Sequence, residues 1–241
     1  QGYALLKLTH EQPLPKMYPG QFAELKVDGS ETTFLRRPIS VNYVDEEKNE
    51  GWFLIHEIGD GTRNLGSLEV GDKLNVVMPL GNGFTMPSSG DEKVLLVGGG
   101  VGTAPLLFMG KEMVKLGCRP AFLLGGRSAG DLMQLDMFRV LGDVYITTED
   151  ASEGEKGFVT QHSVWQREHF DRIATCGPKP MMMAVARYAK SKGIPCEVSL
   201  ENMMACGVGA CLCCVENTTE GHLCVCKEGP VFNTNRLLWQ I

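Results

Sequence analysis

The sequence predicts three domains in series: an antiparallel β-barrel over residues 1–90, a parallel α/β sheet over 91–195 and a small cysteine-rich domain over 196–241. Three observations support this division. Short strand-like runs come first, strands alternating with helices follow, and cysteines crowd the last part of the chain. The 241 residues, 43% hydrophobic and 22% charged, form a globular protein, which excludes disordered, collagen-like and coiled-coil classes.

The first domain is predicted from apolar runs of strand length separated by turn residues such as Pro19-Gly20 and Asp28-Gly29. Helical periodicity is nearly absent here. Many short strands at this spacing are typical of an antiparallel barrel or sandwich. The expected strands cover residues 2–9, 22–27, 52–57 and 73–78.

The second domain begins at Asp91, where the pattern changes. A buried strand over 93–97 leads into a glycine-rich turn, and a helix follows with Pro105 in its first turn and Gly117 at its end. Further strands are expected over 121–124, 144–147 and 173–176, a helix over 180–192, and one more candidate strand over 194–200. Strands that alternate with helices indicate a parallel, doubly wound sheet.

The tail from Glu201 to Ile241 has few periodic apolar positions, so we expect it to need a metal to stay folded. Of the nine cysteines, six lie between residues 206 and 226. No secretory signal is visible and the cysteine total is odd, so metal or redox chemistry is favoured over disulfides. We therefore expect a cytoplasmic protein.

Charge and hydropathy exclude two classes of partner. The net charge is −6, and no run of Lys or Arg is longer than a pair, so nucleic acid is not expected. The apolar runs over 94–97 and 121–124 are far too short to cross a bilayer, so no membrane association is expected.

The cysteine spacing is the most specific signal. Cys206, Cys211 and Cys214 follow the x4-then-x2 spacing of plant-type [2Fe–2S] proteins, with a further cysteine beyond. Small residues such as Gly207 and Gly209 let backbone N–H groups approach the cluster and stabilise the charge added on reduction. Structural zinc is the alternative, but this spacing is uncommon for zinc.

The spacing leaves the fourth ligand open between Cys224 and Cys226. In an extended segment the two would face the same side, so only local geometry would choose between them. Cys213, between two expected ligands, is predicted to be a small buried residue.

The glycine-rich turn predicts a nucleotide site, because glycines between a strand and a helix let a pyrophosphate approach the helix N-terminus. Its expected contacts are Gly98, Gly99, Gly100, Gly102 and Thr103. The second strand ends in Gly125-Gly126-Arg127 without an obvious acidic residue, which leaves NAD and NADP both open.

Cys176, Gly177 and Pro178 end the strand over 173–176, at the sheet edge where ligands bind in open α/β sheets. They are expected to contact the same nucleotide, and Cys176 is the candidate catalytic thiol beside a nicotinamide. Met181 to Met183 are expected to face the core.

Four motifs resemble, in this order, those of the ferredoxin–NADP reductase-like flavoproteins: Arg37-Pro38-Ile39-Ser40, Gly61-Thr62, the run from Gly98 to Pro105, and the run from Cys176 to Met181. The tail narrows the resemblance. Residues 201–211 and 225–232, which include Val225-Cys226 and Gly229-Pro230-Val231-Phe232, are similar to those of the electron-transfer subunits of class 1B dihydroorotate dehydrogenases.

The resemblance implies three sites. FAD would be held by Arg37, Pro38, Ile39 and Ser40, by the strand Leu54, Ile55 and His56, and by Gly61 and Thr62 at the pyrophosphate. The [2Fe–2S] cluster would be held by Cys206, Cys211, Cys214 and Cys226. The gap between Cys214 and Cys226 is short for the family.

These parts make chemical sense together. A nicotinamide exchanges a hydride, an iron–sulfur cluster passes single electrons, and a flavin can do both. The resemblance implies that dihydroorotate is oxidised on a separate FMN-containing barrel subunit, in a heterotetramer of two catalytic and two electron-transfer subunits, with NAD⁺ as the acceptor. An NADH-dependent ferredoxin:NADP⁺ oxidoreductase or a sulfhydrogenase subunit is the alternative. Leu237, Leu238 and Trp239 are expected either at the partner interface or on their own domain.

Overall fold

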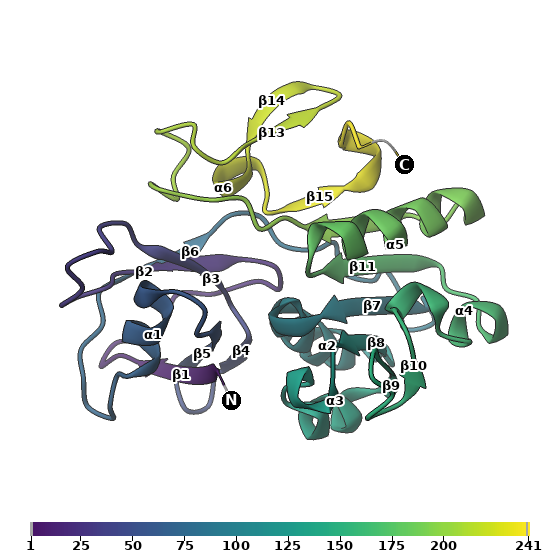
Figure 1. Ribbon diagram of the computed structural model, residues 1–241, viewed down its shortest axis with the longest axis horizontal. Coiled ribbons are helices and arrows are strands. Elements are labelled where there is room, and N and C mark those ends of the chain that lie inside the picture. Colours follow the sequence, from purple (N-terminus) through teal and green to yellow (C-terminus); the bar gives the residue numbers. More distant parts are fainter. Residues whose placement is uncertain (1, 240) are drawn as a thin grey trace.

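The N-terminal part of the chain is built from two small antiparallel sheets that enclose one core. The computed structural model describes residues 2–239 and 241. One sheet has the order β1-β5-β4 and the other β3-β2-β6 (Figure 1). The strands are β1 (Tyr3–Thr9), β2 (Phe22–Leu25), β3 (Arg37–Ser40), β4 (Tyr43–Asp45), β5 (Glu50–His56) and β6 (Val76–Leu80).

Alternation along β2 divides its side chains between two faces. Ala23 and Leu25 belong to the core between the two sheets. Phe22 belongs to a different core, and Glu24 lies on the same side of the strand as Phe22. The helix α1 (Asp60–Gly66) contributes Leu65 to the barrel core. The sequence does not predict this helix, because it is only two turns long and shows no clear apolar period.

The second part is a seven-stranded sheet in the order β10-β9-β8-β7-β11-β12-β15. All of its pairings are parallel except β12 with β15. Its strands are β7 (Val94–Gly99), β8 (Ala121–Gly126), β9 (Asp143–Thr148), β10 (Glu155–Lys156), β11 (Arg172–Cys176), β12 (Cys196–Ser199) and β15 (Val231–Asn233).

Helices cover both faces of this sheet, as the sequence predicts. One core contains residues of α2 (Ala104–Lys115) and α3 (Leu135–Leu141). The other contains residues of α4 (Val164–Arg167) and α5 (Lys179–Lys192). Short 3-10 segments complete the connections: η1 (Gly100–Thr103), η2 (Ala129–Asp131), η3 (Val159–Gln161) and η4 (Thr234–Arg236).

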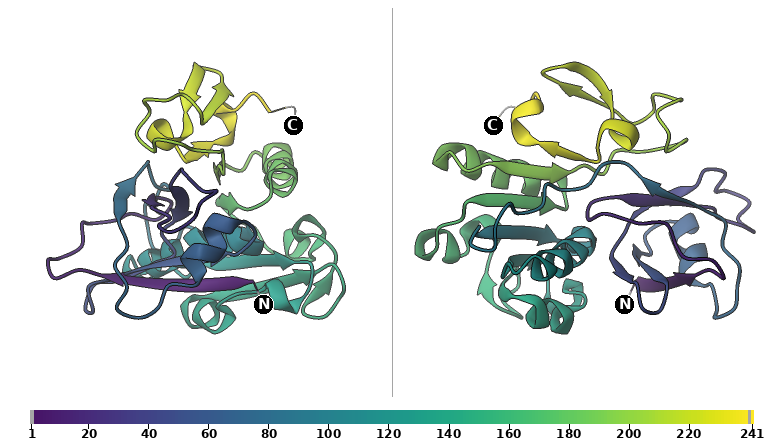
Figure 2. Two further views of the ribbon diagram at one scale, coloured as in Figure 1. Left: turned by 60° about the vertical axis from the view of Figure 1, so that its left-hand side comes forward. Right: turned by 180° about the vertical axis from the view of Figure 1, so that it is seen from behind.

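The cysteine-rich region lies across the other two parts (Figures 1 and 2). It contains the hairpin of β13 (Val215–Thr218) and β14 (Gly221–Cys224), the single-turn helix α6 (Val225–Glu228) and β15. Its core is shared, because Phe22 of β2, Met182 of α5 and Val198 of β12 pack with Phe232 and Leu237. The tail therefore buries more apolar surface than its length alone predicts.

The expected fold class is confirmed, with a barrel, a parallel sheet and a small C-terminal region in that order. The boundaries at residues 90 and 195 remain predictions. The strand β12 begins at Cys196, past the second boundary, yet it extends the parallel sheet. None of the described helices combines the length and the hydropathy needed to span a membrane.

Candidate functional site

A cavity of about 620 Å³ lies between the barrel and the carboxyl ends of the parallel strands. The turns after β7, β8 and β11 form one side, and Tyr3 and His56 of the barrel form the other. The rings of Tyr3 and His56 stack with their centroids 4.5 Å apart. Ligands of open α/β sheets bind at this edge, so the cavity is the candidate nucleotide site.

Glycine is required where two of these turns meet. A Cβ on Gly102 would lie 2.4 Å from Cα of Gly177 and 2.6 Å from the carbonyl oxygen of Cys176. Gly177 itself has a φ of +147°, which other residues rarely adopt. The two predicted nucleotide motifs therefore pack directly on each other, backbone against backbone.

The predicted nucleotide contacts divide into two groups. Gly99, Gly100, Gly102, Gly177 and Pro178 line the cavity. The other three, Gly98, Thr103 and Cys176, are buried and are not part of its lining. Met181, expected to face the core, packs against two hydrophobic cores and also lines the cavity.

The thiol of Cys176 has a carboxylate neighbour that the motifs do not indicate. Its Sγ lies 3.8 Å from Oε1 of Glu201, which lines the cavity. Burial raises the pKa of Cys176 well above its ordinary value and also raises that of Glu201. Glu201 follows β12, so it reaches the same carboxyl edge as the glycine turns. The rule for parallel strands could have predicted it.

Acidic groups surround Arg127 in the same cavity. Asp131 Oδ2 accepts hydrogen bonds from the backbone N–H of Arg127 at 3.2 Å and from its Nε at 3.4 Å. Asp131 Oδ1 accepts from the hydroxyl of Tyr3 at 3.4 Å, and Glu149 also lines the cavity. A cationic side chain at the expected ribose end is thus already paired with a carboxylate.

The expected FAD residues gather on the barrel. Arg37 to Ser40 form β3, and Leu54 to His56 end β5. Ile55 is buried in the barrel core, so its side chain is not available to a ligand. His56, in contrast, lines the cavity.

Arg37 meets the turn at Gly61, where a ligand phosphate is expected. A Cβ on Gly61 would lie 2.9 Å from Cγ2 of Thr33 and 3.2 Å from Cδ of Arg37. The Nε of Arg37 donates to the carbonyl of Arg36, but neither Nη atom has an acceptor among the described residues. A guanidinium with two free nitrogens fits a pyrophosphate, so the residues present fit FAD.

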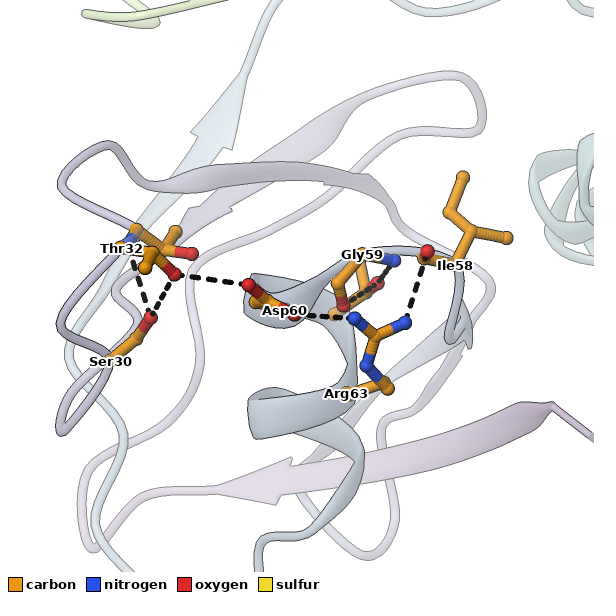
Figure 3. A network of polar contacts seen from close by, with 8 residues as sticks. Ser30, Thr32, Ile58, Gly59, Asp60 and Arg63 are labelled. Carbon is orange, nitrogen blue, oxygen red and sulfur yellow. Dashed lines mark hydrogen bonds and ion pairs between the residues drawn. The ribbon is translucent and has the colours of Figure 1, made fainter.

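A polar network fixes the position of this turn (Figure 3). Thr62 Oγ1 accepts a hydrogen bond from the N–H of Gly59 at 3.0 Å. Asp60 accepts from Thr32 Oγ1 at 3.1 Å and is also paired with Arg63. These contacts connect the start of α1 to the loop before β3, which holds Gly61 and Thr62 beside Arg37.

The four cysteines expected to bind the cluster converge around one loop. The N–H groups of Val208 and Ala210 donate to Cys206 Sγ at 3.5 and 3.3 Å, and that of Gly209 donates to Cys226 Sγ at 3.1 Å. The N–H of Cys226 donates to Cys214 Sγ at 3.3 Å. Such N–H···S bonds are typical of iron–sulfur proteins.

The thiols form two groups along the loop. Cys206 interacts with Cys211, and Cys214 interacts with both Cys226 and Cys224. Among the described residues no three cysteine, histidine, aspartate or glutamate side chains are placed to hold one metal ion. Two groups of thiols around one loop fit a two-iron centre, in which each iron takes two thiolates.

The pKa values of two of these thiols shift in opposite directions. The N–H groups of Val208 and Cys211 lower the pKa of Cys206 to about 6, which favours the thiolate. Burial raises the pKa of Cys226 to about 12. A bound iron would ionise Cys226, because a coordinated thiol loses its proton.

The two remaining cysteines of the region differ from their expectations. Cys213 is exposed and not buried, because the loop turns it outward between the flanking thiols. Cys224 ends β14 while Cys226 lies in α6, so the two do not share an extended strand. The Sγ of Cys224 lies 4.0 Å from the carbonyl oxygen of Gly209.

Comparison with known proteins gives the same grouping of features. A family model described as the iron-sulfur cluster binding domain of dihydroorotate dehydrogenase B matches residues 201–238. The dihydroorotate dehydrogenase B (NAD⁺) electron transfer subunit of Shouchella clausii is 41% identical over 220 residues, 89% of this chain and 84% of that protein. The protein of the same name from Caldanaerobacter subterraneus is 38% identical over 97% of this chain and 92% of its own length.

Solved structures agree on the architecture. A structure of an NADH-dependent reduced ferredoxin-NADP oxidoreductase superposes with a TM-score of 0.88 at 28% identity, covering 99% of this chain and 86% of its own. An Amycolatopsis cytochrome P450 reductase shares the fold, with a TM-score of 0.68 at 24% identity over 79% of this chain and 62% of that one. On the extent and identity of these matches, the chain belongs to the family of dihydroorotate dehydrogenase B (NAD⁺) electron-transfer subunits.

Proposed function

We propose that this chain receives electrons from a dihydroorotate-oxidising partner and passes them through a [2Fe–2S] cluster and FAD to NAD⁺. The observation that supports this most strongly is that cysteine thiols gather around the loop from Cys206 to Cys214 and accept backbone N–H groups there. Gly207 of this loop packs against Glu24 of β2, and β2 pairs with β3, the strand expected to bind the flavin. Family membership supports each cofactor.

In this proposal the cavity binds NAD⁺. The close turns at Gly100, Gly102 and Gly177 leave room for the pyrophosphate, because no side chain fills the space in front of the strand ends. Cys176 and Glu201 lie at the end expected for the nicotinamide. Burial raises the pKa of both side chains and so disfavours a charge on them, which suits a site where a hydride enters or leaves.

The barrel residues would hold FAD. Arg37 would bind the pyrophosphate with its free Nη atoms, and Gly61 and Thr62 would border it. Bound there, FAD would exchange the two electrons of a hydride for single electrons. Ser40 and His56 are the proposed contacts nearer the ring.

The cysteine loop would hold the cluster through Cys206, Cys211, Cys214 and Cys226. The N–H groups of Val208, Gly209 and Ala210 point at the thiols and would stabilise the charge of a reduced centre. A bound [2Fe–2S] cluster supplies one-electron transfer.

The exposed face of this loop is the proposed docking surface for the catalytic partner. Cys211 is exposed, and large apolar side chains nearby are exposed as well: Met203 at 82%, Val208 at 57% and Leu212 at 64%. Apolar residues exposed together around a redox centre fit a protein partner that must come close. We propose two catalytic and two electron-transfer subunits in the assembly.

The test uses the chain together with the FMN-containing catalytic subunit. The purified complex should contain FAD, iron and labile sulfide, and it should reduce NAD⁺ when dihydroorotate is added without oxygen. The catalytic subunit alone should oxidise dihydroorotate without reducing NAD⁺. A complex that carries both cofactors but does not form NADH would contradict the proposal.

A second candidate function is favoured by the superposition with the NADH-dependent ferredoxin-NADP oxidoreductase, at a TM-score of 0.88. The chain would then be the FAD and [2Fe–2S] subunit of such an enzyme. The partner that co-purifies with the chain distinguishes the two: an FMN barrel subunit supports the first function, and a ferredoxin-oxidising subunit supports the second.

A further inference from the structure

Glu24, in the middle of β2, is a buried acid with no partner. Its side chain is 1% exposed, and neither carboxylate oxygen has a hydrogen-bond partner. Among the described residues it is the only carboxyl group with both oxygens in this condition. A buried, unpaired carboxyl group destabilises a fold, so its presence calls for a reason other than stability.

The carboxyl group faces the cysteine loop and not the barrel core. Phe22, on the same side of β2, packs in the core of the cysteine-rich region. Gly207, which follows Cys206, lies directly on Glu24: a Cβ there would be 2.7 Å from Cγ and 3.1 Å from Oε1 of Glu24. The loop that surrounds the proposed cluster thus rests on this side chain.

Glu24 also borders the proposed flavin strand. It is paired in register with Pro38 of β3, and Val77 of β6 is its partner on the other side. Phe22 is paired with Ser40 in the same way. The carboxyl group therefore lies between the residues assigned to FAD and the loop assigned to the cluster.

The cations near Glu24 do not neutralise it by direct contact. Arg36 donates to the backbone carbonyls of Glu24 and Asn75, and Arg37 donates to the carbonyl of Arg36. Burial raises the pKa of Glu24 to about 7, while Arg37 and Arg36 oppose this increase and Cys206 adds to it. Arg37, Arg36 and Cys206 are thus the charged or titratable groups near enough to affect the carboxyl group.

We propose that the Glu24 carboxylate sets the reduction potential of the iron–sulfur centre held by the Cys206 loop. When it is ionised, a carboxylate in a region of low dielectric disfavours the addition of an electron nearby, so it lowers the potential. Glu24 would act on the centre by its charge, from behind the loop, and it touches no reacting atom. The inference rests on the proposed function, because it requires the cluster.

The test measures the midpoint potential of the cluster in the full chain, loaded with FAD and cluster, by redox titration followed by electron paramagnetic resonance. Glu24→Gln keeps the shape and removes the charge. At a pH well above 7, where the wild-type carboxyl group is ionised, the variant should have a more positive potential. At a pH well below 7 the difference should shrink, because the wild-type group is then neutral as well.

Two further variants separate the local charge from other causes. Asp28→Asn also removes one negative charge, but from a side chain just after β2 that is 60% exposed to solvent. This variant should leave the potential of the cluster unchanged. Glu24→Met has a similar volume without a polar group and should shift the potential in the same direction as Glu24→Gln.

The outcomes are distinguishable from a failure of the proposed function. If the wild-type chain assembles no cluster, the proposed function and this inference both fail. If the wild type carries the cluster and Glu24→Gln has the same potential at high pH, only the inference fails. Loss of the cluster in both Glu24 variants would assign Glu24 a structural role and overturn the inference as well.

Discussion

At the scale of single residues, the contacts of Cys224 and Cys226 distinguish two candidates for the fourth cluster ligand that the sequence spacing leaves open. Cys226 is buried, accepts the N–H of Gly209 and donates its own N–H to Cys214. Cys224 is only partly buried and its Sγ lies 4.0 Å from the carbonyl oxygen of Gly209, although its thiol also interacts with Cys214. The proposal of Cys226 as the fourth ligand therefore rests on its burial and on the N–H groups that connect it to the loop.

Cys226→Ser should abolish cluster assembly while FAD stays bound. A serine oxygen is a poor substitute for a thiolate that binds one of the two irons. Iron and labile sulfide should fall to background, whereas the flavin absorbance should remain. Cys224→Ser is the matched control and should keep the full iron content; the reverse pattern would make Cys224 the fourth ligand.

Asp131→Asn should raise kcat/KM for NADP⁺ relative to NAD⁺, by roughly tenfold, or about 1.4 kcal/mol. Burial alone would raise the pKa of Asp131, but the hydrogen bonds and charge of Arg127 lower it below its ordinary value. The ionised carboxylate would repel a 2′-phosphate and occupy Arg127. Steady-state kinetics with both nucleotides measure the ratio.

The control for that change is Asp136→Asn, which removes a fully exposed carboxylate from the first turn of α3. It should leave the ratio of the two nucleotides unchanged. An equal change in both variants would attribute the effect to net charge and not to the Arg127 contact.

The sequence predicts the residues whose chemistry depends on local spacing. The cysteine loop and the glycine turns can be recognised because their members lie close together in the chain. Glu201 could not be recognised from local spacing, since its contact is with Cys176 of another strand and only its place after β12 indicates the site. The hydrogen bond between Asp131 and Tyr3 likewise joins two distant parts of the chain. The outward position of Cys213 likewise depends on the path of the whole loop.

At the scale of elements, the nucleotide site depends on two turns in backbone contact. Gly102→Ala should destabilise the protein by about 1–3 kcal/mol, the usual cost of overpacking. The new Cβ would overlap backbone atoms of Cys176 and Gly177, which cannot move aside as a flexible side chain can. Since the turn after β11 must then move, the KM for NAD⁺ should rise as well. Thermal unfolding and steady-state kinetics measure the two effects.

Gly130→Ala is the control, because its Cβ would meet nothing closer than 3.6 Å, the hydroxyl oxygen of Ser128. It should change neither the unfolding temperature nor the KM. A Gly102 variant with wild-type stability would show that the two turns can separate at little cost.

The long buried strands and the helices that follow them could be predicted, because their apolar runs are continuous. The elements that sequence patterns missed are short or depend on distant partners. The strand β15, with three residues, exists because it pairs with β12 across more than thirty positions of the chain. No local sequence pattern indicates such a pairing. The helix α1 and the strand β4 are likewise too short to give a recognisable pattern.

At the scale of the whole molecule, the cysteine-rich region is held by more than its expected metal. Phe22, Met182 and Val198, from three elements outside the region, share its core. The side chain of Asn82 also connects the barrel part to this region, since its Nδ2 donates to the carbonyls of Lys227 and Glu228 at 2.9 and 3.2 Å. The region is thus fastened to both other parts.

Removal of the cluster should therefore loosen the loop without detaching the region. After removal of iron, hydrogen exchange should increase over residues 203–214, while β15 and its partner β12 remain protected. Exchange followed by mass spectrometry measures this. Equal loss of protection over β15 would show that the metal, and not the shared core, holds the region in place.

The cysteine-rich region lies along one side of the molecule, above the barrel and the parallel sheet in the view of Figure 1. Leu212, 64% exposed beside Cys211, should contribute apolar area to the interface with the catalytic subunit. Leu212→Asp should weaken the complex, as seen by sedimentation or gel filtration. NADH-linked reduction of an artificial acceptor by the chain itself should stay intact. Val140→Asp, at an 86% exposed apolar position on α3, should leave the complex unchanged; equal weakening by both variants would rule out this face as the docking surface.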